Sequence, residues 1–158
     1  MMRKHFIVPD EGHKATPEPQ WLNLEALADV EITSEDDAHP VESALLPGRG
    51  SGWRAAEPGK QIIRLRFVEP QRLRRIHLDF FEANAERTQE YLLRWSADGG
   101  RSYRDIVRQQ WNFSPQAATA EVEDHDVDLW GVTVLELSIV PDISGGNTPA
   151  SLARLRLA

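Results

Sequence analysis

Apolar and polar residues alternate with a period of two along most of this chain. From about residue 30 onward the alternation forms short segments separated by Pro, Gly and Asp, which predicts β-strands, because successive strand side chains point to opposite faces. The predicted strands cover residues 30–34, 61–68, 72–81, 89–96, 103–111, 119–127, 132–140 and 151–157. Only Trp21–Val30 shows helical spacing, enough for one short turn. About eight short strands with almost no helix indicate an all-β sandwich or barrel.

The clearest local element is a β-hairpin over residues 87–114. Its turn, "SADGG" at Ser96–Gly100, supplies Asp-Gly and Gly-Gly, which tolerate the positive φ angles of tight hairpin turns. Folding the chain about this turn makes paired residue numbers sum to roughly 199, with the parity left open by the turn type. Arg87 is therefore expected opposite Trp111, Asn112 or Phe113, at the end of the hairpin far from the turn.

Two segments fall outside the strand pattern. Residues 1–20 are polar and rich in proline, so we expect a flexible N-terminal arm before a single domain at 21–158. Residues 35–60 form a long irregular connection. Loops of that length inside a compact domain are more often functional or specially packed than idle.

Composition narrows the function. The chain has 158 residues and no cysteine, so disulfides and thiolate metal sites are excluded. We see neither a signal peptide nor an apolar run that could span a bilayer, and we expect a cytoplasmic protein. The formal net charge is −7, which disfavours nucleic-acid partners. Five arginines between residues 64 and 75 alternate with apolar residues in part, as on the solvated face of a half-buried strand.

No catalytic constellation is visible. Asp124, Asp126 and Asp128 share one strand face, but with no second cluster a solvated edge explains them better than a cation site. The histidines are scattered, and His39-Pro40 is typical of a turn. We therefore expect a protein that is not an enzyme. Trp53 can close the sandwich or face a ligand, and Arg54 can pair with a carboxylate such as Glu42, Glu57 or Glu82 or face a ligand.

The order of several segments resembles the discoidin or coagulation-factor type C family. These are "VEITSED", "PVESALL", "GWRAAEPGKQIIRLRF", "LRRIHLDF", "RTQEYLLRWSADGG", "VTVLELSIVPD" and "ASLARLRLA", which together cover about residues 30–157. The resemblance implies a discoidin-like jelly-roll β-sandwich of the galactose-binding-like superfamily. It also implies a non-catalytic module that binds sugars, phospholipid head groups or proteins through loops at one end.

The sequence departs from that family in ways that matter. The loop "LLPGRGSG" carries no carboxylate where sugar-binding members often hold calcium, and Arg154 stands near the last strand, so we expect no metal and no cofactor. Three functions stay open. The first is carbohydrate binding, the second is protein–protein interaction in a larger assembly, and the third is a DNA-repair-associated module. The last follows only from a similarity of "GWRAAEPGKQIIRLRF" to the N-terminal domain of an X-ray-repair scaffold protein.

The open end of the hairpin is the candidate ligand site. A sugar stacks its C–H face on an indole, and its hydroxyls need planar donors and acceptors such as Arg and Asn. The candidate residues are Arg87, Trp111 and Asn112, with Arg49 and Asn147 as outer members. In the alternative interpretation Trp111 caps the core and Arg87 pairs with Glu82, Glu86 or Glu90.

Overall fold

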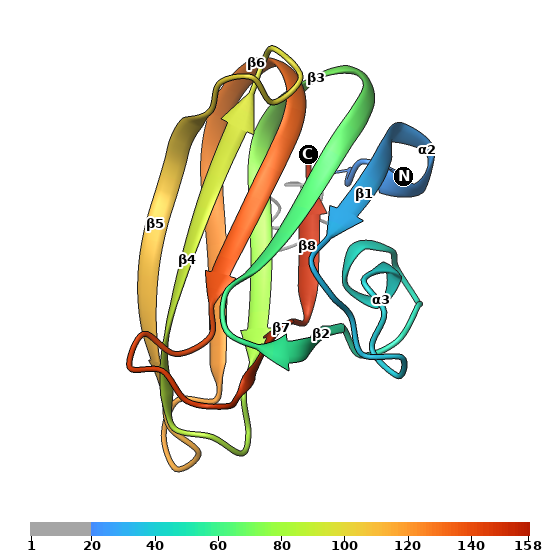
Figure 1. The fold of residues 1–158 in the computed structure, drawn as a ribbon. Helices are drawn as coiled ribbons and strands as arrows, with labels where there is room; N and C mark the ends of the chain where they lie inside the picture. Colours follow the sequence, from blue (N-terminus) through green and yellow to red (C-terminus); the bar gives the residue numbers. More distant parts are fainter. Residues whose placement is uncertain (1–19) are drawn as a thin grey trace, which may run out of the picture.

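A computed structural model describes residues 20–158 and shows a two-layer β-sandwich (Figure 1). The predicted arm lies outside these residues except for Gln20. The strands are β1 Ala28–Ile32, β2 Trp53–Pro58, β3 Gln61–Phe81, β4 Arg87–Ser96, β5 Arg104–Phe113, β6 Ala120–Val140, β7 Pro149–Leu152 and β8 Arg154–Leu157. Two single-turn helices, α2 Leu24–Leu27 and α3 Glu42–Leu45, flank one side. Neither has the length or apolar content to cross a membrane, and no other helix in the described part does.

Strands β3 and β6 belong to both layers. Their halves nearest Gln61 and Val140 pair with each other in the sheet ordered β1-β3-β6-β4-β5. Their other halves pair again beyond a bend, and there β8 adds to β3. The bend falls at Pro70, which cannot donate to the ladder, and at Gly131, whose φ of 69° suits glycine. Prediction and structure differ here: four of the predicted segments are halves of two bent strands.

An irregular pairing keeps the apolar face of β3 inside after the bend. The buried residues are Ile63, Leu65 and Phe67 before it, and Ile76, Leu78 and Phe80 after it, so the parity changes from odd to even. The register shifts between Leu73 and Arg75, where two steps along β3 correspond to three steps along β6 from Leu129 to Asp126, as at a β-bulge. The core is therefore continuous along the whole strand.

The hairpin forms as predicted, with a small difference in register. Partners sum to 200 from Arg87–Phe113 to Leu93–Val107 and to 199 at Arg94–Asp105, because the register shifts between Leu93 and Arg94. In the turn, Asp98 accepts hydrogen bonds from the Arg101 and Ser102 amides at 3.0 and 2.9 Å. Arg87 thus lies opposite Phe113, one of the three expected partners.

Two elements were not predicted. Strand β2 is short and pairs only with β7, and the predicted segment 151–157 splits at Ala153 into β7 and β8, which pair with different strands. Gly52 leads into β2 with φ 109°, and a Cβ there would lie 2.6 Å from the Leu152 carbonyl oxygen. Only glycine fits this approach, which brings Trp53 into the core at 1% exposure. Of the two roles left open for Trp53, this burial supports the structural one.

A buried carboxylate joins the central strands on the outer face of the larger sheet. Glu136 on β6 accepts from Arg64 Nε on β3 at 2.7 Å and from Arg94 Nη2 on β4 at 2.5 Å, and its side chain is 3% exposed. Burial by itself raises the pKa of Glu136, but the hydrogen bonds from both arginines outweigh it and hold the pKa below its usual value. The ionised form therefore stabilises the fold.

We predict that Glu136→Gln lowers the free energy of unfolding at pH 7 by about 1–3 kcal/mol, since two partly exposed arginines lose their shared partner. Because the folded pKa is depressed, this advantage exists above pH 4.5 and is lost as pH falls through the folded pKa, so wild type and variant should converge in acid. Urea denaturation at several pH values measures the difference. Glu31→Gln, which removes an exposed partner of Arg66, should cost less than about 0.5 kcal/mol. Equal losses in the two variants would contradict the role of Glu136.

Candidate functional site

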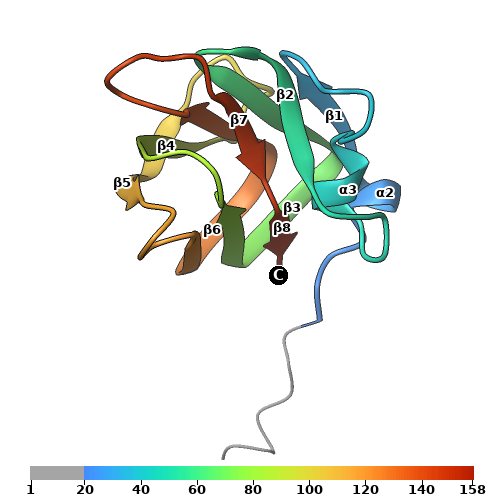
Figure 2. The same ribbon diagram turned by 90° about the horizontal axis from the view of Figure 1, so that it is seen from below.

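Several connections meet at one end of the sandwich, seen face-on in Figure 2. They are residues 82–86 between β3 and β4, 114–119 between β5 and β6, 141–148 between β6 and β7, and part of 33–52 before β2. Backbone hydrogen bonds join them, from Glu82 N to Thr119 O at 2.7 Å and from Ile143 N to Thr88 O at 2.8 Å. We call this the loop end.

Arg87 is the internal anchor of the loop end. It is 3% exposed, and its Nε donates to Glu82 Oε1 at 2.9 Å while Nη1 donates to the Pro141 carbonyl at 2.8 Å. Its guanidinium lies 4.6 Å from the Phe113 ring centroid. One side chain therefore connects loop 82–86, loop 141–148 and the hairpin. This is the pairing with Glu82 that the alternative interpretation anticipated.

The partner carboxylate is held ionised. Burial by itself raises the pKa of Glu82, but the hydrogen bonds from Arg87 and from the backbone amides of Asn84 and Ala85 outweigh it and lower the pKa. A buried charge is tolerated when it is paired and hydrogen-bonded. The loop 82–86 is therefore folded around this ion pair.

A polar cleft of about 530 Å³ opens at the end of the hairpin. We call it the hairpin-end cleft; it is lined by Glu86, Arg87, Thr88, Asn112, Phe113, Ser114, Asp142 and Ser144. Thr88 Oγ1 donates to Asn112 Oδ1 at 2.7 Å, which orients an otherwise exposed amide toward solvent. The lining offers hydrogen-bonding groups, whereas its aromatic ring, Phe113, is 1% exposed.

The five predicted site residues separate in the structure. Arg87 and Asn112 line the hairpin-end cleft. Trp111 packs partly against the core, and its Nε1 is buried without a hydrogen-bond partner. Asn147 is exposed on loop 141–148 but is not among the lining residues. Arg49 lies elsewhere, with its guanidinium 3.6 Å from Glu25 beside α2.

A second, smaller cleft at the loop end holds an exposed aromatic ring. This Phe81 cleft, about 250 Å³, is lined by His39, Ser51, Trp53, Arg54, Phe81, Ser151, Leu152 and Ala153. Phe81 is 58% exposed, whereas Trp53 is buried and donates from Nε1 to the Ser34 carbonyl at 3.0 Å. The cleft therefore combines the accessible ring of Phe81 with the buried, hydrogen-bonded indole of Trp53.

Polar side chains line the Phe81 cleft together with the ring. Arg54 is exposed, and its backbone is held by hydrogen bonds with His39 O at 3.1 Å and Asp36 N at 2.8 Å. His39 Nδ1 donates to Asp36 Oδ2 at 2.8 Å, and this hydrogen bond lowers the pKa of Asp36. This hydrogen bond fixes the imidazole beside the cleft. A guanidinium, an imidazole and serine hydroxyls thus line the same cleft as the Phe81 ring.

Sequence reasoning missed Phe81 and His39 as site residues. A usable signal existed for Phe81, because "FF" at a strand end sends two adjacent rings to opposite faces and only Phe80 is needed by the core. His39 gave no comparable signal, because its place depends on how the long connection before β2 folds. In residues 20–158 there is no group of three or more His, Asp or Glu side chains that could hold a metal ion.

A row of polar side chains lies between the layers behind the Arg87 anchor. Gln89 Nε2 donates to Glu121 Oε1 at 3.2 Å, and Tyr91 hydrogen-bonds His125 at 2.8 Å. Burial raises the pKa of Glu121 to about 8, and its hydrogen bond with Glu123 adds to this shift. The folded protein therefore favours the protonated form of Glu121 more than the unfolded chain does.

This protonation predicts a pH dependence of stability. The folded state binds a proton at Glu121 that the unfolded state releases near pH 4.5, so stability falls as pH rises from about 5 to 8, by up to about 1.4 kcal/mol per pH unit. Glu121→Gln, a neutral isostere, should flatten this slope. Urea midpoints over the same range measure this slope, with Glu69→Gln, at an exposed position, as the control. Identical slopes in wild type and Glu121→Gln would show that Glu121 is ionised when folded.

No family model matches the sequence, and no curated protein matches it. Solved structures do match. The module CpGH89CBM32-5 from Clostridium perfringens, in complex with GalNAc-β-1,3-galactose, gives a TM-score of 0.63 at 19% identity, covering 87% of this chain and 99% of that one. The family 32 CBM of NanJ from C. perfringens, in complex with galactose, gives 0.62 at 14% identity, covering 87% and 96%. A pectin-binding carbohydrate-binding module gives 0.61 at 14% identity, covering 83% and 89%.

These three structures match 83–87% of this chain. At such low identity the likeness concerns architecture rather than individual site residues. The chain has the discoidin-like jelly-roll β-sandwich fold.

Proposed function

We propose that this chain is a non-catalytic module that binds carbohydrate in the Phe81 cleft. The observation that carries the proposal is the exposed Phe81 ring at the loop end, with Arg54 and His39 beside it. A sugar presents a C–H face that packs on an aromatic ring, and hydroxyls that accept from a guanidinium or an imidazole. The cleft is slightly smaller than the pockets typical of drug-sized ligands, which suits a single sugar ring.

The comparisons support the same class of ligand. The structures of CpGH89CBM32-5 and the NanJ module each contain a galactose-type sugar, and both are matched over most of their length. Some other matched structures are parts of enzymes, such as a fucosidase of which the match covers 26%. The matched part in the first cases is a binding module, and this supports a binding role for our chain.

Charge pairing on the sheet faces also favours a sugar over a nucleic acid. Several of the arginines in the run 64–75 contact carboxylates: Arg64 contacts Glu136, Arg66 contacts Glu31, Arg72 contacts Asp128 and Arg75 contacts Asp124. Paired guanidiniums present little net positive potential, and a contiguous basic stripe is what phosphate backbones require. The exposed large apolar residues are spread over different elements, which disfavours one broad protein-docking patch.

We predict that Phe81→Ala weakens sugar binding at least about tenfold, the equivalent of 1.4 kcal/mol, because the stacking face is lost. Stability should change by less than about 1 kcal/mol, since the ring is mostly exposed. A glycan array followed by calorimetric titration with the bound sugars measures both effects. The matched control is Trp130→Ala, which removes an equally exposed ring at the β6 bend, remote from the loop end (Figure 1), and should leave binding unchanged.

The hairpin-end cleft is the alternative place where the sugar could bind. If Asn112→Ala abolishes binding while Phe81→Ala does not, the sugar binds in the hairpin-end cleft and our assignment is wrong. If neither variant changes the affinity, or the wild-type chain binds no glycan, the proposed function fails. Arg54→Ala gives a second measure at the Phe81 cleft, because Arg54 is exposed and its side chain can be removed without disturbing the core.

A further inference from the structure

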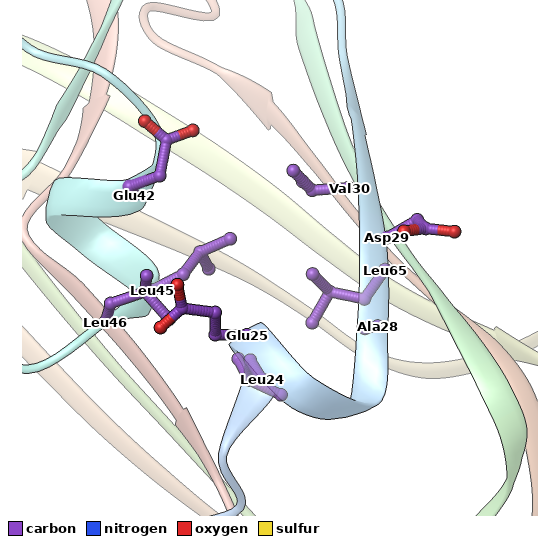
Figure 3. Close-up of a pocket in the computed structure, with 9 residues that line it drawn as sticks. All are labelled: Leu24, Glu25, Ala28, Asp29, Val30, Glu42, Leu45, Leu46 and Leu65. Atoms are coloured by element: carbon purple, nitrogen blue, oxygen red, sulfur yellow. The ribbon is translucent and has the colours of Figure 1, made fainter.

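Carboxylates line other hollows of this acidic chain. An apolar hollow of about 240 Å³ between α2, β1 and α3 is nearly the same size as the Phe81 cleft (Figure 3). Its lining includes Glu25, Asp29 and Glu42, and Figure 3 shows Glu25 on α2 and Glu42 on α3. The hairpin-end cleft is lined in part by Glu86 and Asp142. Both places therefore disfavour an anionic ligand.

The Phe81 cleft has the opposite charge. Among residues 20–158, no Asp or Glu lines it, and its ionisable lining residues are Arg54 and His39. The carboxylate of Asp36, which is outside the lining, is already hydrogen-bonded to His39 Nδ1 at 2.8 Å. Although the whole chain has a net charge of −7, the lining of this cleft is positive.

The positive charge of the Arg54 guanidinium is free for a ligand. Within the described part of the chain, none of the ion pairs and none of the cation–π contacts includes Arg54. By contrast Arg154, which follows the lining residue Ala153, donates from Nε to Asp79 Oδ2 at 2.8 Å. A guanidinium presents its donors in a planar fork that matches the two oxygens of a carboxylate.

The backbone of Arg54 is fixed although its side chain is exposed. Its amide donates to the His39 carbonyl at 3.1 Å, and its carbonyl accepts from the Asp36 amide at 2.8 Å. In the β2–β7 pair, Arg54 lies directly opposite Ser151, so the two side chains project from the same face. The cleft therefore presents a guanidinium and a hydroxyl side by side, next to the exposed ring.

We propose that Arg54 makes the Phe81 cleft selective for sugars that carry a carboxylate, the hexuronic acids. This inference rests on the proposed function, because it assigns the charge of the ligand in the same cleft. The C–H face of the sugar packs on Phe81, its carboxylate accepts two hydrogen bonds from Arg54, and its hydroxyls bond to the serines. Because Arg54 is exposed, the selectivity amounts to a few-fold difference in affinity, and neutral sugars bind more weakly in the same place.

The test compares two ligands that differ only at carbon 6. Methyl galactoside carries a hydroxymethyl group there, and methyl galacturonide carries a carboxylate. Calorimetric titration of the full chain at pH 7 and low salt should show about fivefold tighter binding of the uronide. Added salt should reduce this preference, because it screens the exposed charges. Phe81→Ala should weaken the binding of both ligands.

Variants of Arg54 test the source of the preference. Arg54→Gln should lower the affinity for the uronide to that for the galactoside, and Arg54→Lys should keep part of the difference, because an ammonium retains the charge without the planar fork. The matched control is Arg74→Gln, which removes the same charge from an exposed position on β3. Arg74 precedes Phe81 by seven residues, about 23 Å along the strand, so the preference should be unchanged.

The outcomes separate this proposal from the proposed function. Equal affinities, or tighter binding of the galactoside, would overturn the selectivity while leaving the cleft as a sugar site. Equal losses of preference in Arg54→Gln and Arg74→Gln would also overturn it, because the preference would then reflect the net charge of the chain. If neither ligand binds, the glycan array decides: binding of neutral glycans alone overturns the selectivity, and binding of no glycan overturns the proposed function as well.

Discussion

The buried ion pair between Arg87 and Glu82 is the interaction on which the loop end depends. A guanidinium withdrawn from water must be paired, and here its Nε donates to a carboxylate from loop 82–86 and its Nη1 to a carbonyl from loop 141–148. Both loops are therefore fixed relative to the hairpin. Phe81 immediately precedes Glu82, so the same pair holds the exposed ring in place at the end of β3. The anchor and the proposed ligand contact are thus adjacent in the chain but have different tasks.

The sandwich below supplies rigidity to this arrangement. Strands β3 and β6 pass through both layers, so the two sheets cannot shift independently, and Glu136 joins the central strands through two arginines. Strands β4 and β6 run directly into the loop end, so the loops there are attached to rigid strands. A site on fixed elements loses little conformational freedom when a ligand binds, which favours affinity for a small, hydroxyl-rich molecule.

Much of the fold could be predicted from local patterns. Alternation identified most strands, and the turn chemistry of "SADGG" placed Arg87 opposite Phe113 within one residue. The elements that the sequence did not predict depend on contacts between residues far apart in the chain. Strand β2 is short, and it depends on the close approach of Gly52 to Leu152. Strand β3 continues as one strand past Pro70 because it pairs with β6 on both sides of the bend.

The site was harder to predict for the same reason. Local register places Arg87 and Asn112 at the open end of the hairpin as predicted, but both line the hairpin-end cleft and neither lines the Phe81 cleft. Arg49, by contrast, belongs to a long connection that carries it to Glu25 and away from the cleft. His39 and Arg54 are brought to Phe81 by that same connection and by the β2–β7 pair, and neither contact is encoded in the spacing of the sequence.

The most direct test of this account is an NMR titration of the nitrogen-15-labelled chain with galactose. The account predicts progressive shifts of the amides of His39, Arg54 and Phe81 with a common dissociation constant, while the amides at the β3 and β6 bends stay fixed. Shifts confined to the bends around Val68 and Trp130, or to the hairpin-end cleft around Asn112 and Ser144, would contradict the placement of the sugar on Phe81.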